Sequence, residues 1–316
     1  MCIRDRPYVA SDPYHVMYAG EEMPTPNRTD AELETTHPVI RALHRSRIGK
    51  AMSKPEARQL VLPTYLGMIK QIDDHLGRLF SEMDRLGRSK DTLIVFTSDH
   101  GEYMGDHWMG EKDWINEEVV RVPMIVVDPR SQADVTRGTV SNELVEAIDL
   151  VPTFVEALGG ENDSRTQWLE GESLVPLLRG GHGTERDFVV CEADWGFLEM
   201  SHYVGDLNEP RKRRATMLRN DRYKYVLSEI GPNLLYDLED DPDEQNDCIS
   251  DPALQSVVSE LHEQLFSWFR SRRHDTTVTD QMITANSEPG STAKRGIPIG
   301  YWDEEELAAG KRGDLY

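Results

Sequence analysis

The stretch "TLIVFTSDHGEYMGDH", residues 92–107, decides the fold, because an apolar run leads directly into an aspartate and a histidine. An unbroken apolar run between polar residues is typical of a buried strand, and we expect a parallel one. Asp99 and His100 then follow the end of the strand, the edge at which α/β folds bind ligands. The stretch therefore predicts a strand with a functional site at its carboxyl end.

The flanking segments extend this pattern. Upstream, apolar residues recur at steps of three and four from Tyr65 to Leu86, which predicts an amphipathic helix that ends at Gly87. Downstream, "VPMIVVDP", residues 122–129, has the composition of a second strand, and a helix capped by Ser141 or Asn142 is expected to run to Gly159. Helix, strand, loop, strand and helix in this order predict an α/β core.

The composition changes after about residue 182. Four short apolar stretches between polar turns predict antiparallel strands within residues 186–194, 213–221, 222–229 and 233–244, and an amphipathic helix closes the region near residues 254–269. Residues 7–55 read as a long loop region with one short helix near residues 38–49. We therefore expect a core domain over 7–182, a small subdomain over 183–275, an extended tail over 276–316, and a non-native start at 1–6.

Charge and composition exclude several classes of protein. With 35 basic and 57 acidic residues, the chain has a formal charge of −22, which disfavours nucleic acid as a partner. The basic cluster at residues 211–214 is interpreted as a solvated strand edge or a subunit contact, which leaves a homo-oligomer open. No apolar run is long enough to span a membrane, and three scattered cysteines form no disulfide framework, which favours the cytoplasm weakly and leaves the compartment undetermined.

Asp99, His100 and Lys112 are the residues that carry chemistry. An Asp-His pair is more often a capping pair than a metal site, but the end of a strand would hold both side chains in place as ligands of a divalent cation. Lys112 alone would be a solvated lysine. Beside a cation and an anionic ester, the same ammonium can stabilise the charge of a transition state.

Several segments in succession carry a family resemblance. The stretch quoted above, "EEVVRVPMIVVDP", "IDLVPTFVEALG", "GESLVPLL" and "MLRNDRYKYV" with "LLYDLEDDPDE" resemble consecutive blocks of the sulfatase family of the alkaline phosphatase superfamily, over roughly residues 60–270. The segments "GDHW" and "PYHVMY" resemble most closely the branch of phosphonate monoester hydrolases and arylsulfatases.

The resemblance implies a fold and a set of roles. The fold is α/β: the C-terminal part of an alkaline phosphatase-like core, followed by a small α+β subdomain of an antiparallel sheet and one helix. Asp99 and His100 would ligate one divalent cation, with Ca²⁺ or Mn²⁺ favoured, and Lys112 would be the catalytic residue that contacts the substrate oxygens and the nucleophile. His107 is a candidate substrate-binding residue, and a structural role for it is left open.

The nucleophile of the family does not occur in this chain. Sulfatases use a formylglycine made from Cys or Ser in a C/S-x-P-x-R motif, and "PTPNR", residues 24–28, has Pro24 at that position. The further aspartate ligands that the family supplies upstream are also missing. We therefore expect an N-terminally truncated fragment that is inactive as given.

The functional expectation is a metal-dependent hydrolase of sulfate esters or of phosphonate and phosphate esters, acting on a small anionic ester. Two alternatives stay open. One is a phosphodiesterase or phosphotransferase of the same superfamily with a Ser or Thr nucleophile and a second cation, and the other is a non-catalytic relative that keeps the fold for binding.

Overall fold

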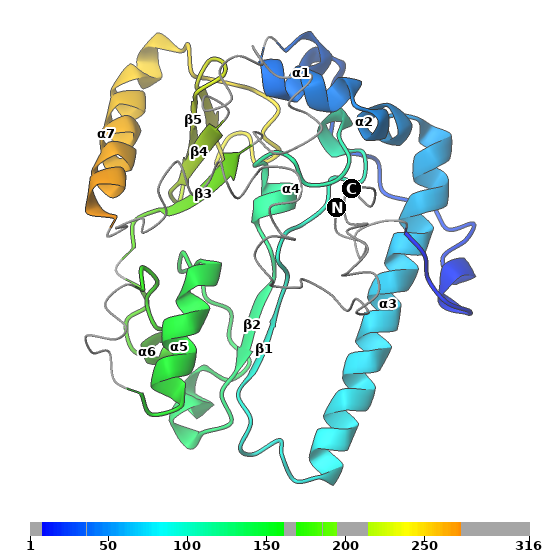
Figure 1. Cartoon of the computed structure of the whole chain (residues 1–316), viewed down its shortest axis with the longest axis vertical. Helices are drawn as coiled ribbons and strands as arrows, with labels where there is room; N and C mark the ends of the chain where they lie inside the picture. Colours follow the sequence, from blue (N-terminus) through cyan, green and yellow to red (C-terminus); the bar gives the residue numbers. More distant parts are fainter. Residues whose placement is uncertain (1–7, 36, 161–168, 185, 195–213, 273–316) are drawn as a thin grey trace, which may run out of the picture. The chain divides into compact units, whose positions relative to one another are not determined.

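The structure is a computed structural model that describes residues 8–35, 37–160, 169–184, 186–194 and 214–272 (Figure 1). The chain divides into two compact units, Met1–Ser271 and Arg272–Tyr316, and all the elements below belong to the first. The expected tail and the expected non-native start lie outside the described residues. The boundary between residues 182 and 183 stays a prediction.

Two short helices occupy the region where one was expected. The 3-10 helices η1 (Tyr14–Val16) and η2 (Asp30–Glu34) precede α1 (Pro38–Arg45) and α2 (Arg47–Met52). Ser46 separates α1 from α2, because its backbone is extended and its hydroxyl accepts a hydrogen bond from Gly49 N at 3.0 Å. This is the usual contact of a helix N-cap, so the second helix starts anew at residue 47.

The long helix α3 (Pro55–Arg85) confirms the periodic pattern and begins earlier than expected, with Pro55 in its first turn. Gly87, with φ of 69°, follows its end. Gly67 lets η1 approach the helix, because a Cβ there would lie 2.1 Å from Tyr14 O. The apolar stripe is only partly covered: Ile72, Leu79 and Phe80 are 52%, 52% and 41% exposed.

The strands β1 (Ile94–Thr97) and β2 (Met124–Val127) pair antiparallel, with Ile94 opposite Val127 and Thr97 opposite Met124. In the described residues, the expectation that this strand pairs in parallel is therefore wrong. The expectation that it is buried is wrong as well. None of the residues of β1 and β2 is buried. An apolar run indicates that a strand has two apolar faces, but it carries no information about which strand lies beside it.

Short helices connect β1, β2 and the C-terminal region. They are η3 (Asp106–Trp108), α4 (Glu117–Val120), η4 (Ser131–Thr136), η5 (Ala147–Asp149), α5 (Leu150–Ala157) and α6 (Val175–Leu178). The helix expected from Ser141 starts only at η5, so neither Ser141 nor Asn142 caps it. A capping box between Glu146 and Asp149 sets the start instead, because each side chain accepts the other residue's backbone N–H.

The C-terminal region confirms the predicted antiparallel sheet and helix. The strands β3 (Val189–Asp194), β4 (Arg214–Arg219), β5 (Tyr223–Ser228) and β6 (Leu234–Asp237) pair in chain order, followed by η7 (Pro252–Leu254) and α7 (Gln255–Ser271). On one face, Leu218, Tyr225 and Leu235 pack with Leu261 and Leu265 of α7.

The other face of this sheet belongs to a second core. The residues Met217, Val226 and Leu234 pack in one cluster with side chains of α1 and of the loop after β1, among them Val39, Leu43, Tyr103 and Trp114. The sheet is therefore covered on both faces, and it supports the loop that carries the candidate site. None of the helices in the described part of the chain combines the length and apolar character that crossing a membrane requires.

Candidate active site

Asp99 and His100 lie immediately beyond β1, as the sequence predicts. The Asp99 side chain is 67% exposed and that of His100 is 24% exposed, with 3.8 Å between Asp99 Oδ2 and His100 Nε2. The carboxylate and the imidazole therefore lie close together beyond the carboxyl end of the strand, and both are accessible to solvent.

The hydrogen bonds of His100 determine which ring nitrogen is basic. Its Nδ1 lies 2.7 Å from Gly101 O, and a carbonyl oxygen can only accept, so Nδ1 carries the hydrogen of the neutral ring. Nε2 is then the nitrogen that carries the lone pair, and Lys112 Nζ donates to it at 2.8 Å. Lys112 thus lies beside His100, although twelve residues separate them in the chain.

Asp99 and His100 fit one side of a divalent cation site. A carboxylate oxygen and an imidazole nitrogen are suitable donors, and the Nδ1–H bond to Gly101 O orients the ring as in protein metal sites. The described residues contain no group of three or more His, Cys, Asp or Glu side chains that could hold a metal ion. If a cation binds here, Asp99 and His100 would supply two ligands, fewer than the six or so that Ca²⁺ takes.

His107 lies at the tip of the loop between β1 and α4, in a buried ionic cluster. Its Nδ1 is 2.5 Å from Glu32 Oε1, and its Nε2 is 3.4 Å from Glu118 Oε1. Burial alone would lower the pKa of His107, but hydrogen bonds to Glu118 and Glu32 raise it to about 10. The imidazole is therefore charged at neutral pH, with both nitrogens beside carboxylates. Its assignment as a substrate-binding residue stays a prediction.

Sequence reasoning missed the partners of His107. Thr29 and Glu32 have the spacing of a capping box, and in the structure the Glu32 carboxylate accepts from Thr29 N at 2.6 Å. That motif explains one contact of Glu32 and gives no indication of the other, because His107 follows 75 residues later. Glu118 and Asn27 have no recognisable local motif at all.

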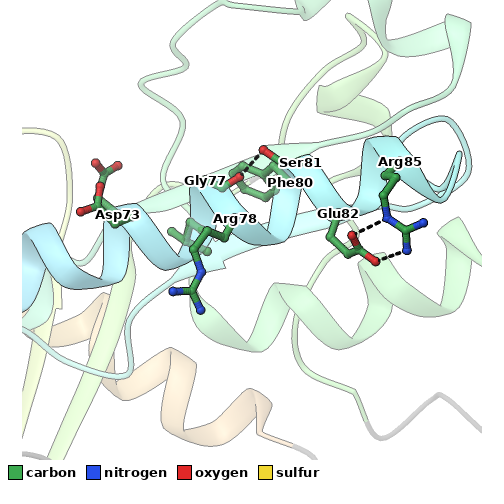
Figure 2. A pocket seen from close by; sticks show the side chains of 9 residues that line it. Asp73, Gly77, Arg78, Phe80, Ser81, Glu82 and Arg85 are labelled. Atoms are coloured by element: carbon green, nitrogen blue, oxygen red, sulfur yellow. Dashed lines mark hydrogen bonds and ion pairs between the residues drawn. The ribbon is translucent and has the colours of Figure 1, made fainter.

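A pocket on the surface of α3 is distinct from these residues. Figure 2 shows side chains that line it, all from α3, including Asp73, Arg78 and Phe80. Arg85 and Glu82 also line the pocket and form an ion pair at 2.5 Å. The pocket contains none of Asp99, His100, His107 and Lys112.

Comparisons with known proteins agree with the family and the fold. Residues 6–160 match the sequence model of the family described as Sulfatase, and residues 105–271 match that of N-sulphoglucosamine sulphohydrolase, C-terminal. The chain is 34% identical over 290 residues to the multifunctional alkaline phosphatase superfamily protein PehA of Trinickia caryophylli, which covers 86% of this chain and 55% of that protein. It is 27% identical over 296 residues to an arylsulfatase of Clostridium perfringens, covering 92% and 56%.

Solved structures give the same result. The phosphonate monoester hydrolase of Agrobacterium radiobacter superimposes with a TM-score of 0.76 at 28% identity, covering 88% of this chain and 58% of that one. The enzyme of the same name from Silicibacter pomeroyi has a TM-score of 0.74 at 27% identity, covering 87% and 56%.

The chain belongs to the sulfatase family of the alkaline phosphatase superfamily, and its fold is the α/β fold of that family with a small C-terminal sheet and helix. It spans about half the length of the curated relatives that it matches.

Proposed function

We propose that the protein to which this chain belongs hydrolyses small anionic esters, either sulfate esters or phosphonate and phosphate esters, with one divalent cation. The convergence of Asp99, His100 and Lys112 carries the proposal, since an ammonium 2.8 Å from a basic imidazole nitrogen and a nearby carboxylate suit a cation and an anionic group together. Relatives named arylsulfatase and phosphonate monoester hydrolase support this class of substrate.

Each of the three residues has a separate role. Asp99 and His100 would hold Ca²⁺ or Mn²⁺, which acts as a Lewis acid on the ester when bound. His100 presents Nε2 because Gly101 O fixes the hydrogen on Nδ1. A cation on Nε2 requires Lys112 to leave that nitrogen, and its ammonium is then available to the oxygens of the transferred group.

The sequence of this chain does not contain the C/S-x-P-x-R motif that supplies the nucleophile in the family. We therefore propose that a formylglycine and the remaining cation ligands belong to the portion of the relatives' length that this chain does not span, and that the chain by itself is inactive. This would account for two candidate cation ligands and a lysine that lie together without the nucleophile motif of the family.

The test compares the chain alone with the chain joined to upstream sequence from its source gene. Hydrolysis of an aryl sulfate and an aryl phosphonate monoester is measured across titrations of Mn²⁺ and Ca²⁺. Only the joined protein should hydrolyse the two esters. Lys112→Ala should lower turnover on the order of 100-fold or more at every metal concentration, whereas excess metal should partly rescue Asp99→Asn.

Asp221→Asn is the matched control, because Asp221 is an exposed carboxylate in the turn between β4 and β5. It should behave like the unmodified protein. Turnover of both esters by Lys112→Ala at the unmodified rate would remove Lys112 from the mechanism, and turnover by the chain alone would contradict the assignment of the nucleophile elsewhere.

A further inference from the structure

The loop that carries the site, residues 98–116, is held in a strained shape. Four non-glycine residues in it have φ in the left-handed region: Met104 at 49°, His107 at 49°, Trp108 at 60° and Glu111 at 64°. Such residues cost conformational free energy and persist only where surrounding contacts impose them. We call residues 98–116 the Lys112 loop and ask what imposes its shape.

Contacts at the tip of the loop come from residues 27–32, which we call the brace segment. Asn27 O accepts from His107 N at 2.7 Å, and Asn27 N donates to Asp106 Oδ1 at 2.9 Å. Thr29 O accepts from Trp108 Nε1 at 2.7 Å. The tip is therefore tied to the brace segment through both backbone and side chains.

Arg28 adds a second set of contacts to the same tip. Its guanidinium lies 4.0 Å from the centre of the Trp108 ring and donates to Gly105 O at 3.2 Å. Its other terminal nitrogen donates to Ser53 O at 3.2 Å, at the end of α2. The segment "PTPNR", which has no role as a nucleophile motif, thus supplies two of the residues that hold the loop.

The ionic cluster connects the tip of the loop to its base. Glu118 O accepts from Glu102 N at 3.2 Å, two residues beyond His100, while the Glu118 carboxylate lies 3.4 Å from His107 Nε2. Glu32 holds the other face of the imidazole. At the base, Tyr103 N donates to Glu111 O at 3.0 Å, which places Lys112 directly after a paired residue.

We infer that the brace segment is the positioning element of the Lys112 loop, and that His107, held between Glu32 and Glu118, is the residue through which it acts. Removing either carboxylate contact releases the tip, lets Tyr103 and Glu111 separate and widens the range of positions that Lys112 takes near His100. Burial would disfavour the charged form of His107, and the two carboxylates stabilise that form. A neutral glutamine in place of either glutamate would remove part of this stabilisation. The inference rests on the proposed function only for the role of Lys112 in catalysis. The position of Lys112 is independent of that function.

The experiment measures amide hydrogen exchange by mass spectrometry on the full 316-residue chain at pH 7.5. Glu32→Gln and His107→Gln should each accelerate exchange in peptides within residues 100–112 on the order of 10-fold or more, because each removes one of the two charges that strengthen this hydrogen bond. The double variant should be no faster than the faster single variant, since both substitutions remove the same contact. Peptides of β4 to β6 should be unchanged.

Three further measurements separate a positioning role from loss of stability in general. Glu34→Gln, in the same 3-10 helix but exposed, should leave exchange as in the unmodified chain. With histidines labelled by ¹⁵N, His107 should show two ring N–H groups, and the His100 Nε2 signal should shift in Glu32→Gln while the fold is retained. Arg28→Lys, which leaves His107 intact, should also accelerate exchange at the tip.

Exchange that rises equally over the whole chain, additive effects in the double variant, or an unchanged His100 signal in Glu32→Gln would each overturn the inference. These readouts do not involve hydrolysis. These measurements can therefore contradict the positioning role without contradicting the proposed function. Likewise, the hydrolysis assay can contradict the proposed function without contradicting the positioning role.

Discussion

At the scale of single residues, Lys224 is a fully buried charge that depends on two ion pairs. It is fully buried in β5, and its Nζ lies 2.8 Å from both Glu117 Oε1 and Glu244 Oε1. Burial raises the pKa of Glu244, and Lys224 opposes that effect. Removing the ammonium would leave Glu244 without this cation and would leave Glu117 with the more distant Arg219, whose Nε lies 3.7 Å from Glu117 Oε1.

We expect Lys224→Met to lower the free energy of unfolding by about 3–5 kcal/mol, because breaking a buried ion pair leaves an uncompensated charge. Urea unfolding followed by tryptophan fluorescence measures the loss. Lys90→Met, an exposed lysine in the turn before β1, should change it by less than about 0.5 kcal/mol. Equal effects of the two substitutions would show that the cluster around Lys224 does not stabilise the fold.

A second residue makes the chain sensitive to acid. His37 packs against Trp114, with ring centres 4.9 Å apart, and burial lowers its pKa to about 4. The ordinary pKa of histidine is about 6.5, so the unfolded chain takes up the proton first as the pH falls. Stability from neutral His37 is complete above about pH 6.5 and is lost between about 6.5 and 4.

Between pH 7 and pH 5 the unmodified chain should therefore lose about 2 kcal/mol of stability more than His37→Gln does. Urea unfolding at the two pH values gives the difference. His15→Gln, at an exposed histidine, is expected to keep the pH dependence of the unmodified chain. The same pH dependence in His37→Gln would mean that other groups cause the loss.

At the scale of elements, two glycines show how the loop and the long helix differ. A Cβ on Gly101 would lie 1.8 Å from Glu118 O, where Gly101 N donates to Val119 O at 2.8 Å. A Cβ on Gly77, within α3, would meet nothing within 4 Å. Gly101→Ala should therefore push the Lys112 loop away from α4, whereas Gly77→Ala should stabilise α3 by roughly 0.5–1 kcal/mol.

Thermal unfolding of the two variants should show a lower midpoint for Gly101→Ala and a higher one for Gly77→Ala. The second substitution is the control for the first, since both add the same methyl group. A midpoint for Gly101→Ala at or above that of the unmodified chain would contradict the close contact between the loop and α4.

At the scale of the whole molecule, the main feature is apolar surface on the long helix and the two-stranded sheet. Ile69 and Ile72 of α3 are 49% and 52% exposed, and Ile125 and Val127 of β2 are 56% and 40% exposed. Exposed apolar side chains promote association, and so do strand edges that pair with no other strand in the described residues. We therefore expect the isolated chain to associate with itself at micromolar concentration.

Light scattering coupled to size exclusion tests this expectation. The double variant Ile72→Asp, Ile125→Lys should shift the distribution toward monomer, whereas Val140→Lys, at a side chain that is 92% exposed in a loop, should not. A single monomeric species for the unmodified chain would contradict the expectation.

The sequence by itself determined the family, the α/β class, the long helix through residues 65–86, the four C-terminal strands and the position of Asp99 and His100 after a strand. These features follow from local patterns, since apolar periodicity and turn residues act within a few positions of one another. Only the tertiary structure decided that β1 pairs antiparallel with β2, that Lys112 donates to His100, and that His107 lies between Glu32 and Glu118.

The physical reason is the range of the interactions. Glu32 and His107 are 75 residues apart, and Lys224 Nζ donates to Ile115 O across 109 residues. Polar residues in such pairs look like ordinary surface residues in the sequence, because their burial depends on packing of the sheet, α1 and the Lys112 loop. A buried charge destabilises the fold unless an ionic partner compensates it, and this condition arises only once the chain has folded.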